Sequence, residues 1–334
     1  PTAAMMQRVQ TVVRRAPQRI VFAEGEEPAV IRAAYAFQES GLGQAILVGR
    51  EETVRANMAS IGLPDTTPLR IVNARLSEQN AAYTDFLYKR QQRFGMLHRD
   101  AQRLVNLDRN VFGACLVAFD HADGMVTGVT RNYATALSDV LKVIDAARGE
   151  MPMGMSIVLS KGRTLFISDT AASEFPDAAE LARITLQSAA MAKQFGATAR
   201  VALLSDSDFG NPEMERSEKI RAAVSMLDRR EDLAFEYEGE MNIDVALNPN
   251  MRELYPFSRL SEAANVLIMP ALHSASIATT LLATAGGATV IGPILAGLAK
   301  PIQIAPLGAA VSDIVTYATL AAFQAAERND AKGA

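Results

Sequence analysis

The chain has 334 residues, which is more than a single hydrophobic core usually serves, so two domains are expected. Apolar residues make up 49% and charged residues 21%, which excludes a disordered chain, and the net charge of −4 gives no overall drive toward nucleic acid or an anionic membrane. Cys115 is the only cysteine, which excludes an intrachain disulfide and a cysteine-rich zinc site and is typical of a protein of the reducing cytoplasm.

No stretch has the pattern of a signal peptide, and the apolar-rich segment 263–283 is interrupted by Asn265 and His273, so we expect no membrane contact. The chain begins at Pro1 rather than at a methionine, and we therefore expect it to be a fragment or a processed chain.

Short apolar runs alternate with helical patterns, which is typical of an α/β fold with a largely parallel sheet. In the first half, strands are expected at 19–23, 45–49, 69–72 and 114–118. A helical pattern covers 81–106, as one long helix or as two helices broken near Phe94 and Gly95. A further apolar run ends at Val129, and a helix is expected over 133–147.

The composition changes at 148–152, where we place a domain boundary. Two runs that follow, 156–159 and 164–167, predict a hairpin that turns at Lys161 and Gly162. Apolar residues at helical spacing then predict a helix that Asp177 caps and Gly196 ends. Buried strands are expected at 201–204 and 266–269, and the second precedes a helix-like run that opens at Leu272.

Common catalytic patterns are absent from the sequence. The three histidines are dispersed and no two have the spacing of metal ligands on a helix, no nucleophile elbow occurs, and no Gly-x-Gly-x-x-Gly follows a strand. The chain is therefore expected to hold no metal and no nicotinamide cofactor of its own. The small-residue loop 272–277 is either a phosphate-holding loop or a simple helix start, and the second is favoured locally.

One run near the C-terminus is more specific. Gly-Pro-Ile-Leu-Ala-Gly-Leu-Ala-Lys-Pro at 292–301, followed by Gly308 and Asp313, resembles the signature of the phosphate acetyltransferase (phosphotransacetylase) family. Segments 123–128 and 168–171 match in order and spacing, and the resemblance covers essentially the whole chain. It is strongest to the version fused to the C-terminus of bacterial hybrid NADP-dependent malic enzymes. Where the family has Ser-Arg, this chain has Pro306 and Leu307.

The resemblance implies a two-domain α/β fold of the phosphotransacetylase type, which is like that of isocitrate and isopropylmalate dehydrogenases, with a coenzyme A site in a cleft between the domains. Residues 1–148 and 303–334 would form the first domain, and 149–302 an inserted second domain.

Carried over residue by residue, Asp313 matches the proposed base of the family, whereas Pro306 and Leu307 replace the oxyanion donor and an arginine. A second functional arginine aligns with Ser138 and Asp139. Losing one transition-state donor costs roughly 10²–10³ in rate, so we expect the transfer chemistry to be lost. Two interpretations of Asp313 stay open, a vestigial base and a helix-capping carboxylate.

The resemblance thus implies a regulatory and oligomerisation domain that binds acetyl-CoA as an allosteric inhibitor. The oxidative decarboxylation of malate, with NADP and Mg²⁺ or Mn²⁺, would take place in an N-terminal part of the polypeptide. A homodimer or higher oligomer is implied. The alternatives are a residual phosphate acetyltransferase and a purely structural oligomer-forming domain. The residues expected to contact acetyl-CoA are Arg90, Arg93, Thr127, Arg131, Ser138, Ser160, Lys161, Ser274, Ser276, Ile277, Gly292, Pro293, Pro306, Leu307, Gly308 and Asp313.

Overall fold

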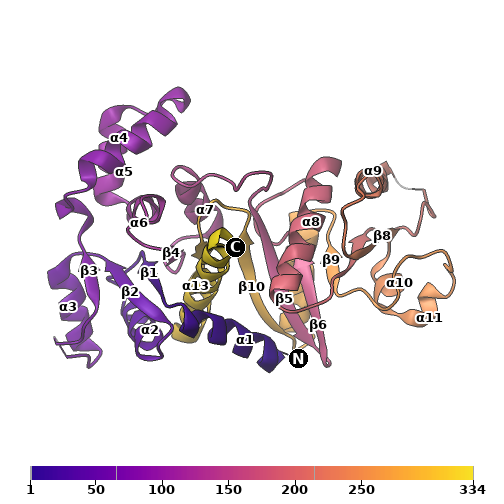
Figure 1. The fold of residues 1–334 in the computed structure, drawn as a ribbon, viewed down its shortest axis with the longest axis horizontal. Coiled ribbons are helices and arrows are strands. Elements are labelled where there is room, and N and C mark those ends of the chain that lie inside the picture. Colours follow the sequence, from indigo (N-terminus) through magenta and orange to yellow (C-terminus); the bar gives the residue numbers. More distant parts are fainter. Residues whose placement is uncertain (1, 65, 214, 334) are drawn as a thin grey trace. The chain divides into compact units, whose positions relative to one another are not determined.

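The computed structural model describes the whole chain except residues 1, 65, 214 and 334 (Figure 1). It divides into two compact units. The terminal unit comprises residues 7–147 and 298–334, and the inserted unit comprises 148–297 together with residues up to 6. The chain re-enters the terminal unit at Leu298 rather than at the expected residue 303, because the backbone N–H of Ala299 donates to the carbonyl of Asp145 and Leu298 bridges to Ala146.

The terminal unit is built on a five-stranded, wholly parallel sheet. Its order is β11 (Ile302–Ile304), β4 (Gly124–Thr127), β1 (Gln18–Phe22), β2 (Gly43–Val48), β3 (Arg70–Val72). The strands expected at 19–23, 45–49 and 69–72 are thus confirmed, and so is the α/β fold. Strands β2 and β3 lie in chain order on one side of β1, whereas β4 and β11 lie on the other side. The strand order therefore reverses between β1 and β4.

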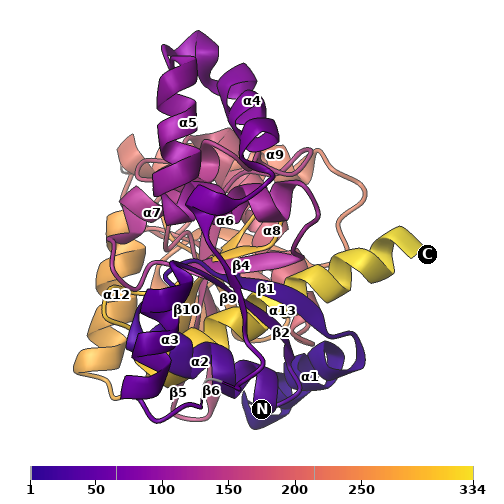
Figure 2. The same ribbon diagram turned by 90° about the vertical axis from the view of Figure 1, so that its left-hand side faces the viewer.

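Helices cover both faces of this sheet (Figures 1 and 2). Phe22 of β1 packs edge-on against Phe37 of α2 (Pro28–Glu39), which lies beside α13 (Val311–Gly333). Val21, the preceding residue, faces the opposite way, toward α6 (Arg109–Ala118), where a Cβ added at Gly113 would stand 3.3 Å from Val21 Cγ1. The same unit also contains α1 (Thr2–Arg15), whose first residues group with the inserted unit, α3 (Glu51–Ser60) and α7 (Tyr133–Leu141).

The connection from β3 to β4 is helical. The 3₁₀ helix η1 (Ala74–Leu76) leads into α4 (Asn80–Gln91), η2 (Gln92–Phe94) and α5 (His98–Leu107), and α4 and α5 lie side by side in Figure 2. The break expected near Phe94 and Gly95 is therefore confirmed.

Two predicted elements in this unit are wrong. The apolar run 114–118 is the last half of helix α6 rather than a strand, because Asp108 accepts hydrogen bonds from the backbone N–H groups of Asn110 (2.9 Å) and Val111 (3.0 Å) and so starts a helix there. The helix expected over 133–147 ends at Leu141, and the chain from there forms the crossing into the inserted unit.

The inserted unit holds a six-stranded mixed sheet. Its order is β10 (Thr289–Ala296), β5 (Met153–Ser160), β6 (Arg163–Ser168), β9 (Val266–Ile268), β7 (Arg200–Leu204), β8 (Glu236–Met241). β10 and β6 flank β5 in antiparallel fashion, and β6, β9, β7 and β8 are parallel. The predicted hairpin and the strands at 201–204 and 266–269 are confirmed.

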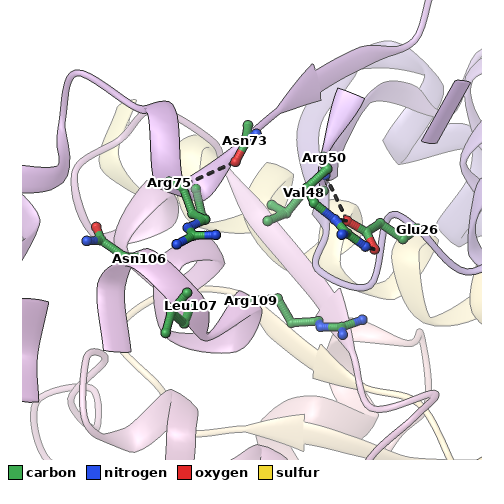
Figure 3. Close-up of a pocket in the computed structure, with 10 residues that line it drawn as sticks. Glu26, Val48, Arg50, Asn73, Arg75, Asn106, Leu107 and Arg109 are labelled. Carbon is green, nitrogen blue, oxygen red and sulfur yellow. Dashed lines mark hydrogen bonds and ion pairs between the residues drawn. The ribbon is translucent and has the colours of Figure 1, made fainter. Parts of the chain in front are cut away.

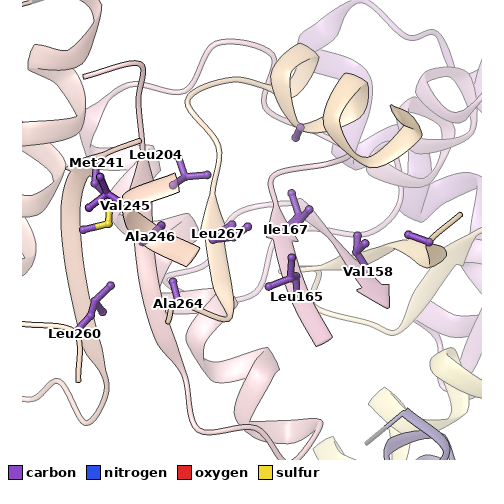
Figure 4. Packing of buried hydrophobic residues seen from close by; sticks show 13 residues of the cluster. Val158, Leu165, Ile167, Leu204, Met241, Val245, Ala246, Leu260, Ala264 and Leu267 are labelled. Atoms are coloured by element: carbon purple, nitrogen blue, oxygen red, sulfur yellow. The ribbon is translucent and has the colours of Figure 1, made fainter. Parts of the chain in front are cut away.

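Helices α8 (Ala178–Gln194), α9 (Glu218–Asp228), α10 (Ile243–Leu247), α11 (Pro249–Arg252) and α12 (Leu272–Thr284), with the 3₁₀ helix η3 (Glu215–Ser217), complete this unit. Asp177 and Glu180 form the expected cap of α8 reciprocally. One buried cluster packs Ile167 and Leu267 of the sheet with Val245 of α10 and Ala275 of α12 (Figure 4).

A close backbone approach fixes the carboxyl ends of β4 and β11 relative to each other. The N–H of Ala305 donates to the carbonyl of Thr127 at 2.7 Å, and Gly128, at φ 108°, lies so close that an added Cβ would stand 2.4 Å from the carbonyl oxygen of Ala305. Only glycine fits there.

We expect Gly128→Ala to destabilise the protein by about 2–4 kcal/mol, because it combines backbone strain with this clash. Gly41→Ala is the matched control: Gly41 also has a positive φ (68°), but its added Cβ would meet nothing within 4 Å, and a cost of about 1–2 kcal/mol is expected. Urea unfolding of both variants measures the difference, and equal losses of stability would contradict the account.

Candidate functional site

The loop that carries the replaced signature residues follows β11 at the carboxyl edge of the terminal unit's sheet. The N–H of Gly308 donates to the carbonyl of Val129 at 2.9 Å, which ties this loop to the loop after β4. Pro306 and Leu307 are exposed, and the Leu307 side chain is 66% accessible. Proline has no N–H and the leucine side chain is apolar, so neither side chain can donate to an oxyanion or neutralise a phosphate.

Asp313 lies exposed in the first turn of α13. Its Oδ2 accepts a hydrogen bond from the backbone N–H of Ala310 at 3.3 Å, just before the helix begins. This contact supports the helix-capping interpretation. The role of vestigial base stays a prediction.

A buried carboxylate that was not predicted from the sequence lies where the strand order reverses, between β1 and β4. Glu24, 1% exposed at the end of β1, accepts from the N–H groups of Val129 and Thr130 at 2.9 Å each and from the Thr130 hydroxyl at 2.7 Å. Ligand anions usually take such N–H groups in open α/β sheets. Here an internal carboxylate takes them. Its position directly after a buried strand was the available sequence signal.

A second carboxylate holds the cations beside the β4 loop. Asp139 of α7, 7% exposed, accepts from Arg131 Nη1 at 2.7 Å and from Lys142 Nζ at 2.7 Å. Arg131 also donates to Asp108 Oδ2 at 2.7 Å. Such charge-assisted contacts are the strong ones among hydrogen bonds. Arg131, expected to contact a ligand, is therefore engaged by two aspartates of its own unit.

The other expected residues of the terminal unit are distributed around this network. Thr127 is buried at the end of β4 and donates to Asn110 Oδ1 at 2.5 Å, whereas Ser138 is exposed on α7. Arg90 of α4 makes a two-pronged ion pair with Asp145 at 2.7 and 2.8 Å, and the hydrogen bonds from Arg90 hold the pKa of Asp145 below its usual range. Arg93 is exposed on η2.

In the inserted unit a cavity of ≈ 510 Å³ opens at the carboxyl ends of the parallel strands β7 and β9. Phe175 and His273 stand on its wall with ring centroids 6.0 Å apart. Lys219 Nζ donates to the carbonyls of Pro176 (3.1 Å) and Pro270 (2.8 Å), and burial, followed by the charge of Arg216, lowers the pKa of Lys219. The cavity is lined by Phe175, Ser205, Asp206, Arg216, Lys219, Ile220, Pro270, Ala271 and His273.

Three expected residues lie at the start of α12, next to this cavity. Ser274 donates to the carbonyl of Ala271, a lining residue, at 2.6 Å, and Ser276 and Ile277 are exposed in the following positions of the helix. The loop 272–277 is thus the start of a helix, as favoured from the sequence.

The structure does not bring the other expected residues of this unit to the same place. Ser160 and Lys161 form the turn between β5 and β6, which is the amino end of β6. Because β6 is parallel to β9, this turn lies at the sheet edge opposite to the cavity. Gly292 and Pro293 lie within β10, where the pairing with β5 is irregular. These four residues are not among the residues that line the cavity.

In the part of the chain that the structure describes, no group of three or more histidine, cysteine or acidic side chains is arranged to hold a metal ion. The helices described there are also too short or too polar to cross a bilayer.

Comparison with known proteins agrees with this fold. The family model described as "Phosphate acetyl/butaryl transferase" matches residues 4–322. The NADP-dependent malic enzyme of Rhizobium meliloti (strain 1021) is 53% identical over 97% of this chain and 43% of its own length. The phosphate acetyltransferase of Pseudomonas putida is 31% identical over 96% of this chain and 45% of its own length. The chain thus spans less than half of either relative.

The crystal structure of a phosphotransacetylase from Streptococcus pyogenes superposes with a TM-score of 0.91 at 28% identity and covers 98% of this chain and 99% of its own. The expected phosphotransacetylase-type fold and the expected similarity to NADP-dependent malic enzymes are therefore confirmed. Because the family model matches residues 4–322, the chain belongs to the phosphate acetyl/butyryl transferase family.

Proposed function

We propose that this chain is an acetyl-CoA-binding regulatory domain of an NADP-dependent malic enzyme that no longer transfers the acetyl group. The observation that carries the proposal is the engagement of Arg131 and Lys142 by Asp139, beside a loop in which Pro306 and Leu307 stand where the family has Ser-Arg.

Transfer of acetyl from coenzyme A to phosphate needs a donor for the carbonyl oxyanion and cations that neutralise the phosphate. Pro306 and Leu307 supply neither. Arg131, Lys142 and Arg90 already carry carboxylate partners, so a phosphate would have to displace Asp139 or Asp145 from its ion pairs. Loss of one transition-state donor alone lowers a rate by roughly 10²–10³, and loss of donor and anion ligands together leaves little transfer.

The cavity of the inserted unit has the chemistry for the nucleotide end of acetyl-CoA. An adenine ring can pack on Phe175, which is 71% exposed, and the phosphates can pair with Arg216. The volume of ≈ 510 Å³ lies in the usual range of small-molecule sites. Ser274 and Ser276, at the helix start beside the cavity, would take part in this site.

In this proposal, the oxidative decarboxylation of malate to pyruvate, with NADP and Mg²⁺ or Mn²⁺, would take place in a part of the polypeptide outside this chain, which matches the malic enzyme of Rhizobium meliloti over 43% of that enzyme's length. Acetyl-CoA would then act as an inhibitor at a distance, with a coupling free energy of about 1–3 kcal/mol. We also propose that the protein is a cytoplasmic homo-oligomer.

The second candidate function is that of a residual phosphate acetyltransferase. It is favoured by the retained Asp313 and by the similarity to the Pseudomonas putida enzyme.

Isothermal titration of the chain with acetyl-CoA tests the binding. We expect Phe175→Ala and Arg216→Gln each to weaken the affinity by about tenfold or more, because a base–aromatic contact and a charge-assisted hydrogen bond are each worth about 1–3 kcal/mol. Arg183→Gln, an exposed residue of α8 outside the cavity, is the matched control and should bind like the parent. Absence of binding at millimolar acetyl-CoA to a folded sample would favour a purely structural oligomer-forming domain.

A second experiment restores the signature. We expect the double variant Pro306→Ser, Leu307→Arg, in the presence of phosphate, to release coenzyme A from acetyl-CoA at a rate within about tenfold of the rate without protein, because Asp139 still holds Arg131 and Lys142. The measurement is thiol release in the presence and absence of phosphate. A rise of about 10²-fold or more would show that the loss rests on these two positions alone.

A further inference from the structure

A second cavity, of ≈ 290 Å³, lies in the terminal unit at the carboxyl ends of β1, β2 and β3 (Figure 3). It is separate from the β4 and β11 loops, where Glu24 and Asp139 engage the donors. None of the residues expected from the sequence to contact a ligand lines it. Three arginines do: Arg50, Arg75 and Arg109.

The floor of this cavity is set by backbone contacts that extend the sheet beyond its strands. The N–H of Gly25 donates to the carbonyl of Val48 at 3.1 Å, and the N–H of Gly49 donates to that of Val72 at 3.0 Å. An added Cβ would stand 2.8 Å from Val48 N at Gly25 and 2.8 Å from Glu26 Cγ at Gly49. The loops after β1 and β2 therefore pack directly on each other and place Glu26 next to Arg50.

One arginine is fixed by this arrangement. Arg50 Nε and Nη2 donate to Glu26 Oε1 and Oε2 at 2.9 and 3.0 Å, in a two-pronged pair, and the backbone N–H of Arg50 donates to Glu26 Oε1 as well. The pKa of Glu26 is lowered chiefly by these hydrogen bonds from Arg50, and the charge of Arg109 contributes further. The carboxylate is thus ionised and neutralises one of the three guanidinium charges.

The other two arginines keep their charge available. Among the residues that the structure describes, the guanidinium groups of Arg75 and Arg109 have no carboxylate within ion-pair distance, in contrast to Arg131 and Arg90. Figure 3 shows the three guanidinium groups around the same space. With Glu26 paired, the cavity carries a net charge of two guanidinium groups, and its walls include the apolar side chains of Val48 and Leu107.

We propose that this cavity binds the phosphate group of a small phosphorylated metabolite. A phosphate monoester is close to a dianion at neutral pH, which matches the two uncompensated charges, and guanidinium forks suit its tetrahedral oxygens. The carboxyl edge of a parallel sheet is the usual place for such ligands. Val48 and Leu107 leave room for a short organic part. The site does not depend on the acetyl-CoA site of the inserted unit.

Isothermal titration at constant ionic strength tests this site with three probes: inorganic phosphate, ribose 5-phosphate and malate. We expect both phosphates to bind, and Arg75→Gln and Arg109→Gln each to weaken them by about tenfold or more. Arg99→Gln removes an equal charge from α5 outside the cavity and should change the affinity by less than about twofold.

Tighter binding of ribose 5-phosphate than of inorganic phosphate identifies an organic phosphate as the ligand, and equal binding identifies the phosphate group alone. Both outcomes support the site. Failure of both phosphates to bind a folded sample at millimolar concentration would overturn it, and so would an equal loss in Arg99→Gln. Binding of malate in preference to both phosphates would overturn the assignment of the ligand class. Because none of the probes contains adenine or an acetyl thioester, the result stands whether or not the inserted unit binds acetyl-CoA.

Discussion

Anion binding by the terminal unit depends on one electrostatic constraint: the buried carboxylate of Asp139 must retain its ion pairs with two cationic side chains. Asp139 lies in a largely buried position, and its two oxygens accept from Arg131 and Lys142 at 2.7 Å each. A buried charge without a partner is costly, so an incoming phosphate gains the cations only by leaving Asp139 uncompensated. Glu24 likewise occupies backbone N–H groups of the loop that follows β4, from which it accepts hydrogen bonds. The N–H groups and cations at the carboxyl end of β4 are thereby occupied by the protein's own carboxylates, beside the loop that carries Pro306 and Leu307.

Cationic side chains that could bind a ligand anion line two cavities, away from Asp139 and Glu24. In the inserted unit, Arg216 and Lys219 line a cavity with an exposed aromatic ring, and in the terminal unit Arg75 and Arg109 line the cavity at β1, β2 and β3. The contrast is electrostatic: Arg90 and Arg131 are ion-paired with aspartates and stabilise the fold, whereas we propose that the arginines without a carboxylate partner bind ligands. We infer that binding has been kept while the reaction has been lost.

Local signals predicted much of the fold. Asp177 predicted the start of α8, the alternation of apolar runs predicted the parallel sheet, and Phe94 and Gly95 marked the break between α4 and α5. The run 114–118 predicts a strand but forms a helix, because a short apolar segment has the same sequence pattern in a buried helix and in a buried strand. In the site, only the resemblance singled out Pro306, Leu307 and Asp313. The partners of Arg90 and Arg131, the position of Ser160 and Lys161 at the opposite sheet edge, and the arginine cavity depend on contacts far apart in sequence, which periodicity cannot supply.

The most direct test is one sample assayed twice, for binding of acetyl-CoA by calorimetry and for its phosphate-dependent consumption by thiol release. The account predicts saturable binding with no phosphate-dependent release above the rate without protein. Phosphate-dependent release by the unaltered chain that disappears in Asp313→Ala would contradict it, because Asp313 would then act as a base and the chain would be a working phosphate acetyltransferase.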